Sequence, residues 1–94
     1  MPVDWGLDDN CIWQDRITSL SVGGCFLQTP RGVKAGRKIS LRIFLATGPG
    51  RILHGEVRYC MERVGLGVEF FDLMEREKEQ LAELVAFFRD PQPS

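Results

Sequence analysis

The sequence predicts a small, mainly β domain, an antiparallel β-barrel of five to six strands followed by one C-terminal α-helix. The first observation behind this prediction is the length of 94 residues, which suits one domain with one modest core. The second is a series of short segments in which apolar and polar residues alternate, separated by glycine- and proline-rich turns. The third is a change to helical periodicity near the C-terminus. Short strands in this sequence favour a meander or Greek-key barrel.

The first three predicted strands lie in the N-terminal half of the chain. The first covers residues 11–18, and the second covers residues 25–28, directly after the interruption at Gly23-Gly24. The third covers residues 39–45 and has the clearest alternation, because every odd position is Ile or Leu. Gly48-Pro49-Gly50 is turn chemistry and leads into the next strand.

Two further strands are predicted before the helix. In the strand over residues 52–61, Tyr59 is expected on the buried face with the leucine and valine that precede it at even spacing. The strand over residues 64–70 has apolar even positions. Its glycines, Gly65 and Gly67, indicate a close approach by another backbone or a bend at a barrel corner.

The predicted helix begins after Asp72, which is expected to be its N-cap, and ends before Asp90-Pro91. Its apolar stripe follows helical spacing and comprises Leu81, Leu84, Val85 and Phe88. The expected organisation is therefore an acidic N-terminal arm over residues 1–10, the barrel with its helix over residues 11–90, and a tail over residues 91–94.

Charge is distributed unevenly behind a net charge of −1, which excludes a generally basic binder of polyanions. Residues 1–15 contain four aspartates and no Lys or Arg, whereas residues 16–63 contain nine Lys or Arg and two glutamates. Residues 64–94 contain seven acidic and three basic residues. The middle of the chain is thus either a solvated basic surface or a docking face for an acidic partner.

Enzymatic and metal chemistry have little support in the sequence. Cys11, Cys25 and Cys60 show no metal-ligand spacing, and an odd number of cysteines favours reduced thiols and a cytoplasmic location. The single histidine, His54, has no second histidine or cysteine pair beside it. We expect no enzyme, no metal, no cofactor and no membrane insertion, since no apolar run approaches the length of a membrane span.

One segment resembles a known family. Ser19-Leu20-Ser21-Val22-Gly23-Gly24 is similar to the signature turn of the PilZ domain family, which reads Asp or Asn, any residue, Ser, two residues, Gly. Gly55-Glu56-Val57-Arg58-Tyr59 and Gly65-Leu66-Gly67-Val68-Glu69-Phe70 resemble later strands of that family, in the same order. The resemblance covers about residues 12 to 88.

The resemblance implies a barrel associated with the bacterial messenger cyclic di-GMP. It carries the family's ligand positions onto Ser19, Ser21 and Gly24, with Ser19 where the family has Asp or Asn. The family's Arg-x-x-x-Arg pair has no counterpart, because no arginine precedes Arg16 and this part of the chain is acidic. The leading hypothesis is therefore a regulatory adaptor module with a degenerate nucleotide site that acts through protein contacts, as in bacterial motility.

Several alternatives remain open at this point. The runner-up is a direct cyclic di-GMP receptor with an altered binding site formed by Arg16, Ser19 and Ser21. Both serines could instead simply form hydrogen bonds with backbone groups of the turn. A nucleic-acid-binding barrel is disfavoured, because the aromatic residues lie mainly at apolar-periodic positions. Candidate contacts to a protein partner or a second copy are Trp5, Trp13 and Phe87, although either tryptophan could instead plug the mouth of the barrel.

Overall fold

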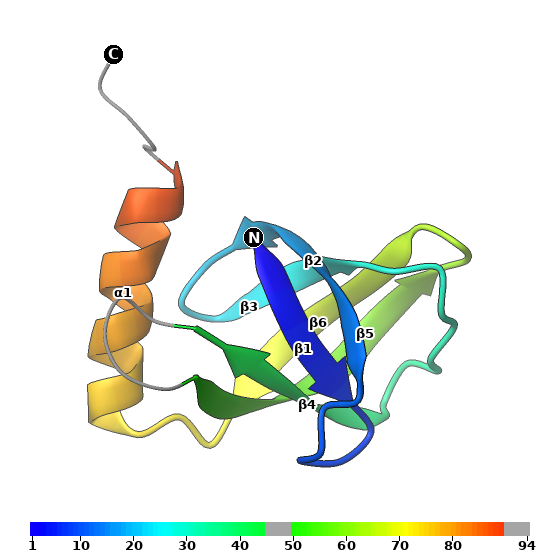
Figure 1. Cartoon of the computed structure of the whole chain (residues 1–94), viewed down its shortest axis with the longest axis horizontal. Helices are drawn as coiled ribbons and strands as arrows, with labels where there is room; N and C mark the ends of the chain where they lie inside the picture. The colour runs from blue at the N-terminus through cyan, green and yellow to red at the C-terminus, as the bar shows by residue number, and fades with distance from the viewer. Residues whose placement is uncertain (45–49, 90–94) are drawn as a thin grey trace.

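The computed structural model describes residues 1–44 and 50–89, without the side chains of residues 88 and 89. Six antiparallel strands close into a barrel in the order β1-β2-β3-β6-β5-β4, and a single helix follows them (Figure 1). The predicted fold class is confirmed. Leu45, the turn at Gly48-Pro49 and the tail over residues 91–94 lie outside the described residues. The elements are β1 (Pro2–Gly6), β2 (Trp13–Leu20), β3 (Gly24–Gln28), β4 (Lys38–Ile43), β5 (Arg51–Met61), β6 (Gly65–Phe71) and α1 (Glu75–Arg89).

Strand β1 corrects the predicted N-terminal arm. Pro2–Gly6 is not an arm outside the barrel but the strand that closes it, because it pairs with β2 on one side and β4 on the other. The acidic side chains have partners on the barrel: Asp4 lies 3.7 Å from Arg42, and Asp15 accepts the Trp5 Nε1–H bond at 2.8 Å. Asp4 and Asp15 therefore join neighbouring strands of the barrel.

The core consists of aliphatic side chains from all six strands, the aromatic Trp5 and Phe70, and Leu81 from α1. It comprises Val3, Trp5, Ile17, Leu20, Leu27, Ile39, Leu41, Ile43, Leu53, Val57, Leu66, Val68, Phe70 and Leu81. The alternation predicted in the third strand holds, since Ile39, Leu41 and Ile43 are all buried. Burying this apolar surface is the main term that stabilises a domain of this size.

Two irregularities in strand pairing change which side chains face outward. The register between β2 and β3 shifts between Ile17 and Ser19, and that between β5 and β6 shifts between Val57 and Tyr59. Each shift places two successive residues on the outer face, as β-bulges do. Tyr59 is consequently exposed, and its predicted position on the buried face is wrong.

Helix α1 lies beside the barrel, and its inner face contributes Leu81, which is 1% exposed (Figure 1). Its beginning differs from the predicted one. Asp72 has a φ of 56° and precedes the helix, while Met74 occupies the N-cap position, because its carbonyl accepts the first helical bond from Lys78. Glu77 caps the helix by accepting the Met74 backbone N–H at 3.0 Å, which is one half of a capping box. Within the described residues, no helix is long and apolar enough to cross a membrane.

Candidate functional site

The motif serines lie in an open cleft of about 290 Å³ on the outer wall of the barrel. The cleft crosses four adjacent strands, β2, β3, β6 and β5, and the two bulges turn Ser19 and Tyr59 toward it. Its volume lies at the lower limit of small-molecule pockets. The lining residues are Ser19, Ser21, Gly24, Cys25, Phe26, Arg58, Tyr59, Gly67 and Val68.

Ser21 and Gly24 build the turn that joins β2 to β3. The Ser21 hydroxyl accepts the Gly24 N–H and donates to the Gly24 carbonyl, both at 3.2 Å, and the Ser21 N–H donates to the same carbonyl at 2.8 Å. The turn-forming role considered for Ser21 is thus confirmed. A side chain at position 24 would collide with the Val68 carbonyl, so glycine is needed there to let β3 pair with β6.

Two glycines on β6 also permit close contacts. A Cβ at Gly65 would collide with the Leu27 carbonyl, which confirms the predicted approach of another backbone. A Cβ at Gly67 would collide with the ring of Tyr59, which therefore rests on the floor of the cleft with its centroid 6.3 Å from that of Phe26. Phe26 and Tyr59 were not among the predicted site residues. The only signal for them was the spacing of Gly65 and Gly67, which marks positions that something must approach.

The electrostatics of the cleft depend on Arg58, its single positively charged lining residue. Its guanidinium lies 3.3 Å from Glu69 and 3.7 Å from Glu56, and all three side chains are partly exposed. Such exposed pairs contribute little to stability, but the two carboxylates offset the charge that Arg58 offers to a ligand. The thiol of Cys25 is not a nucleophile at neutral pH, because burial raises its pKa to about 12.

The structure separates the remaining predicted site residues from this cleft. Arg16 lies on β2 but lines another hollow together with Arg63. Trp5 is 0% exposed, so its predicted role as a partner contact is wrong for the folded protein. Trp13 is half-buried beneath the Arg31 guanidinium, which lies 4.3 Å from the ring centroid. Phe87 on α1 is 71% exposed.

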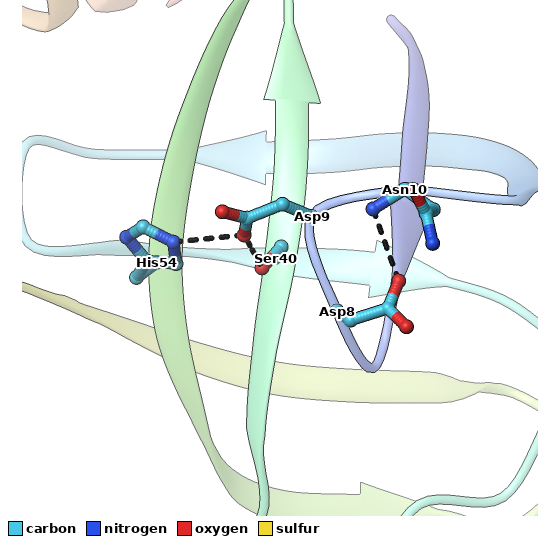
Figure 2. Close-up of polar contacts among 5 residues, drawn as sticks. All are labelled: Asp8, Asp9, Asn10, Ser40 and His54. Atoms are coloured by element: carbon cyan, nitrogen blue, oxygen red, sulfur yellow. Dashed lines mark hydrogen bonds and ion pairs between the residues drawn. The ribbon is translucent and has the colours of Figure 1, made fainter.

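A second polar cluster connects the turn after β1 to the barrel wall (Figure 2). The Asp9 carboxylate accepts the Ser40 hydroxyl at 2.6 Å and lies 3.0 Å from His54 Nε2, both through Oδ1. Ser40 is on β4 and His54 faces it on β5. The hydroxyl of the buried Ser40 is thereby satisfied. His54 is half-buried, with 44% of its side chain exposed.

This cluster has the residue types of a hydrolase triad in the wrong order. Nucleophilic catalysis requires the histidine between serine and carboxylate, so that the imidazole can remove the hydroxyl proton. Here the carboxylate of Asp9 lies between Ser40 and His54, and both contacts converge on one oxygen. The arrangement fastens the turn to the barrel and does not activate Ser40.

Replacing Asp9 by asparagine is expected to lower stability at neutral pH and to have no effect in acid. The Ser40 and His54 hydrogen bonds hold the pKa of Asp9 below its ordinary value of 3.8. A lowered folded-state pKa stabilises the protein above the ordinary value, and this contribution is lost as the pH falls through the folded-state pKa. Urea unfolding of wild type and Asp9→Asn between pH 7 and pH 3 measures the difference.

The matched control for this prediction is Asp8→Asn. Asp8 lies on the same turn, and its carboxylate accepts the local Asn10 N–H bond at 3.0 Å without reaching the barrel wall. We expect little change for this variant at any pH. A stability difference for Asp9→Asn that stays constant from neutral to acid pH would contradict the assigned role of its charge.

The closed barrel and its cleft define a small binding module. Among the described residues there is no group of three His, Cys, Asp or Glu side chains that could hold a metal ion. The model of the PilZ domain family matches residues 6–87, and the chain therefore belongs to the PilZ domain family. PilZ domains are non-catalytic binding modules associated with cyclic di-GMP signalling, so the prediction that the chain is not an enzyme is confirmed. No curated protein and no solved structure matches the chain.

Proposed function

We propose that this PilZ domain is a regulatory adaptor that acts through protein contacts and whose cleft does not hold cyclic di-GMP. The observation that carries the proposal is the charge balance of the cleft. Its one arginine, Arg58, faces the two carboxylates of Glu56 and Glu69. A ligand with two phosphate groups needs uncompensated cations, preferably guanidinium groups that bind phosphate in bidentate fashion.

Other features of the cleft support the same proposal. The Ser21 hydroxyl is engaged on both sides by Gly24, and Arg16 lines a different hollow. None of the aspartates of β1 and its turn lines the cleft, so the weak grip follows from Glu56 and Glu69 and not from an acidic arm. An adaptor of this kind fits a cytoplasmic location, since all three cysteines are free thiols.

Isothermal titration with cyclic di-GMP tests the proposal. We expect no saturable heat up to about 1 mM ligand, which corresponds to a binding free energy weaker than about −4 kcal/mol. The Arg58→Ala variant should give the same trace as wild type. Saturable binding at micromolar ligand that disappears in Arg58→Ala would overturn the proposal and identify the cleft as a receptor site.

A direct receptor is the second candidate, because Ser19, Ser21 and Gly24 converge on one cleft with two aromatic rings. In that case cyclic di-GMP would raise the melting temperature by mass action. If Arg16 binds the ligand, the increase in melting temperature should be lost in Arg16→Ala. A gain that survives this substitution would exclude Arg16 and leave Arg58 as the cation.

A further inference from the structure

A further hollow, here called the basic groove, lies away from the cleft at Ser19 and Ser21. It is formed where the loop between β3 and β4 meets the turn after β1. It has a volume of about 680 Å³. Its cations are Arg31, Lys34 and Arg37, and its apolar lining includes Leu7, Trp13 and Val33. The loop and α1 lie at opposite ends of the long axis of the molecule (Figure 1).

The loop that carries the three cations is held in place by the barrel. The Arg31 N–H donates to the Thr29 hydroxyl at 3.1 Å, and Thr29 is 1% exposed. At the other end, the Gly36 N–H donates to the Val57 carbonyl at 2.7 Å, and the Val57 N–H donates to the Arg37 carbonyl at 2.9 Å. A preorganised loop loses little conformational entropy on binding.

The cations of the groove have no acidic partners within residues 1–44 and 50–89. The ion pairs there use Arg42, Arg58, Lys78 and His54 instead. Three uncompensated positive charges around an apolar floor suit a partner that carries both carboxylates and an apolar side chain.

The position of Trp13 argues against nucleic acid as the occupant. One face of its ring is covered by Arg31, and its ring meets that of Trp5 at 60° with centroids 4.8 Å apart. Trp13 therefore lacks the open aromatic face on which a base would stack. The apolar contact that the groove offers is instead made by Leu7, which is 42% exposed, and by the half-buried Val33.

The outward face of α1 has the complementary chemistry. Glu75, Glu79 and Glu83 follow one another at a spacing of four residues and are all exposed, and Phe87 continues the same series. Phe87 is 71% exposed, although the inner face of the helix is packed on the barrel. Arg76 and Lys78 lie beside these glutamates, and the Lys78 ammonium lies 3.7 Å from the Glu75 carboxylate, so the face keeps a net charge of −1.

We propose that the basic groove binds the outward face of α1 from a second copy of the chain. Glu75, Glu79 and Glu83 approach the three cations, and Phe87 contacts the apolar floor. Because the loop between β3 and β4 and the helix α1 lie at opposite ends of the molecule, the contact is head-to-tail and leaves a free groove and a free helix on every pair. The inference rests on the proposed function in that it names one partner of the protein contacts.

Sedimentation velocity of the full chain tests the contact. The weight-average mass should rise with concentration from the monomer value of 10.7 kDa and pass that of a dimer. Added salt should reverse the rise, because screening weakens exposed charge pairs. Lys34→Glu and Glu79→Lys should each weaken association by about tenfold or more, since each places like charges opposite one another.

The decisive measurement mixes the two variants. The helix of Lys34→Glu and the groove of Glu79→Lys are both intact, so the mixture should associate more strongly than either variant does alone. Arg63→Glu, an equal charge change outside the groove, serves as the control and should associate like wild type. Equal unfolding midpoints establish that the variants are folded.

A wild type that stays monomeric at all concentrations overturns the inference, as does a mixture that fails to associate. Titration with cyclic di-GMP distinguishes failure of this inference from failure of the proposed function. If the chain is monomeric and does not bind the nucleotide, the groove–helix contact is contradicted and the proposed function stands. If the chain associates and binds the nucleotide saturably, the proposed function is contradicted and the contact stands.

Discussion

Replacing Trp5 by alanine is expected to lower the free energy of unfolding by about 3–5 kcal/mol, the range for a tryptophan removed from a core. Trp5 is 0% exposed and packs edge-on against Trp13. Its Nε1–H also donates to Asp15 at 2.8 Å, so truncation leaves that carboxylate without its donor. Domains of this size are only about 5–15 kcal/mol stable, so the loss is a large fraction of the total.

Urea and thermal unfolding measure this effect. For a domain of this length, a loss of about 3 kcal/mol lowers the melting temperature by about 12 °C or more. Ile12→Ala is the matched control, because Ile12 is 71% exposed and a few residues away from Trp5 in the same region of the chain. A loss below about 1 kcal/mol for Trp5→Ala would mean that β1 is not part of the core.

Replacing Gly24 by alanine is expected to be the next most damaging change, with a loss of about 3 kcal/mol, at the upper end of the overpacking range. The added Cβ would collide with the carbonyl of Val68, and backbone cannot move aside without separating two paired strands. The same change displaces the Ser21–Gly24 turn at the edge of the cleft.

Gly32→Ala is the matched control for Gly24→Ala, because a Cβ at Gly32 has no atom within 4 Å. We expect that variant to stay within about 0.5 kcal/mol of wild type. Amide hydrogen exchange localises the damage: the Phe70 N–H, which donates to the Gly23 carbonyl at 2.8 Å, should lose protection in Gly24→Ala. Equal unfolding curves for the two alanine variants would contradict the predicted collision.

Strand β1 shows where local pattern was insufficient. Pro2–Gly6 offers only Val3 and Trp5 as alternating apolar residues, flanked by acidic residues, which is too short a signal to separate a strand from an acidic segment. The segment is a strand because β2 and β4 each present a free edge to it. Those edges belong to residues distant in the sequence, and their unpaired backbone N–H and C=O groups need a strand to pair with.

The β-bulge in β5 explains why Tyr59 was predicted on the wrong face of its strand. Periodicity assigns Tyr59 to the same face as Val57, and that assignment holds only while the pairing register is constant. An extra residue in β5 reverses the facing, and Tyr59 then covers Gly67 on the outside of the barrel. Ser19, Ser21 and Gly24, by contrast, are neighbours in the chain, so one turn brings them to the same cleft.

The sequence alone predicts the fold class, five of the six strands, the helix and the family, because each prediction depends on residues a few positions apart. Which charged side chains lie close to one another could be seen only in the tertiary structure. The sequence predicts an acidic arm outside the barrel at the N-terminus. In the barrel those aspartates pair with Arg42, Trp5, Ser40 and His54, while Glu56 and Glu69 offset Arg58 in the cleft. Coulomb interactions act over a few ångströms in space, and only strand pairing determines which charges come that close.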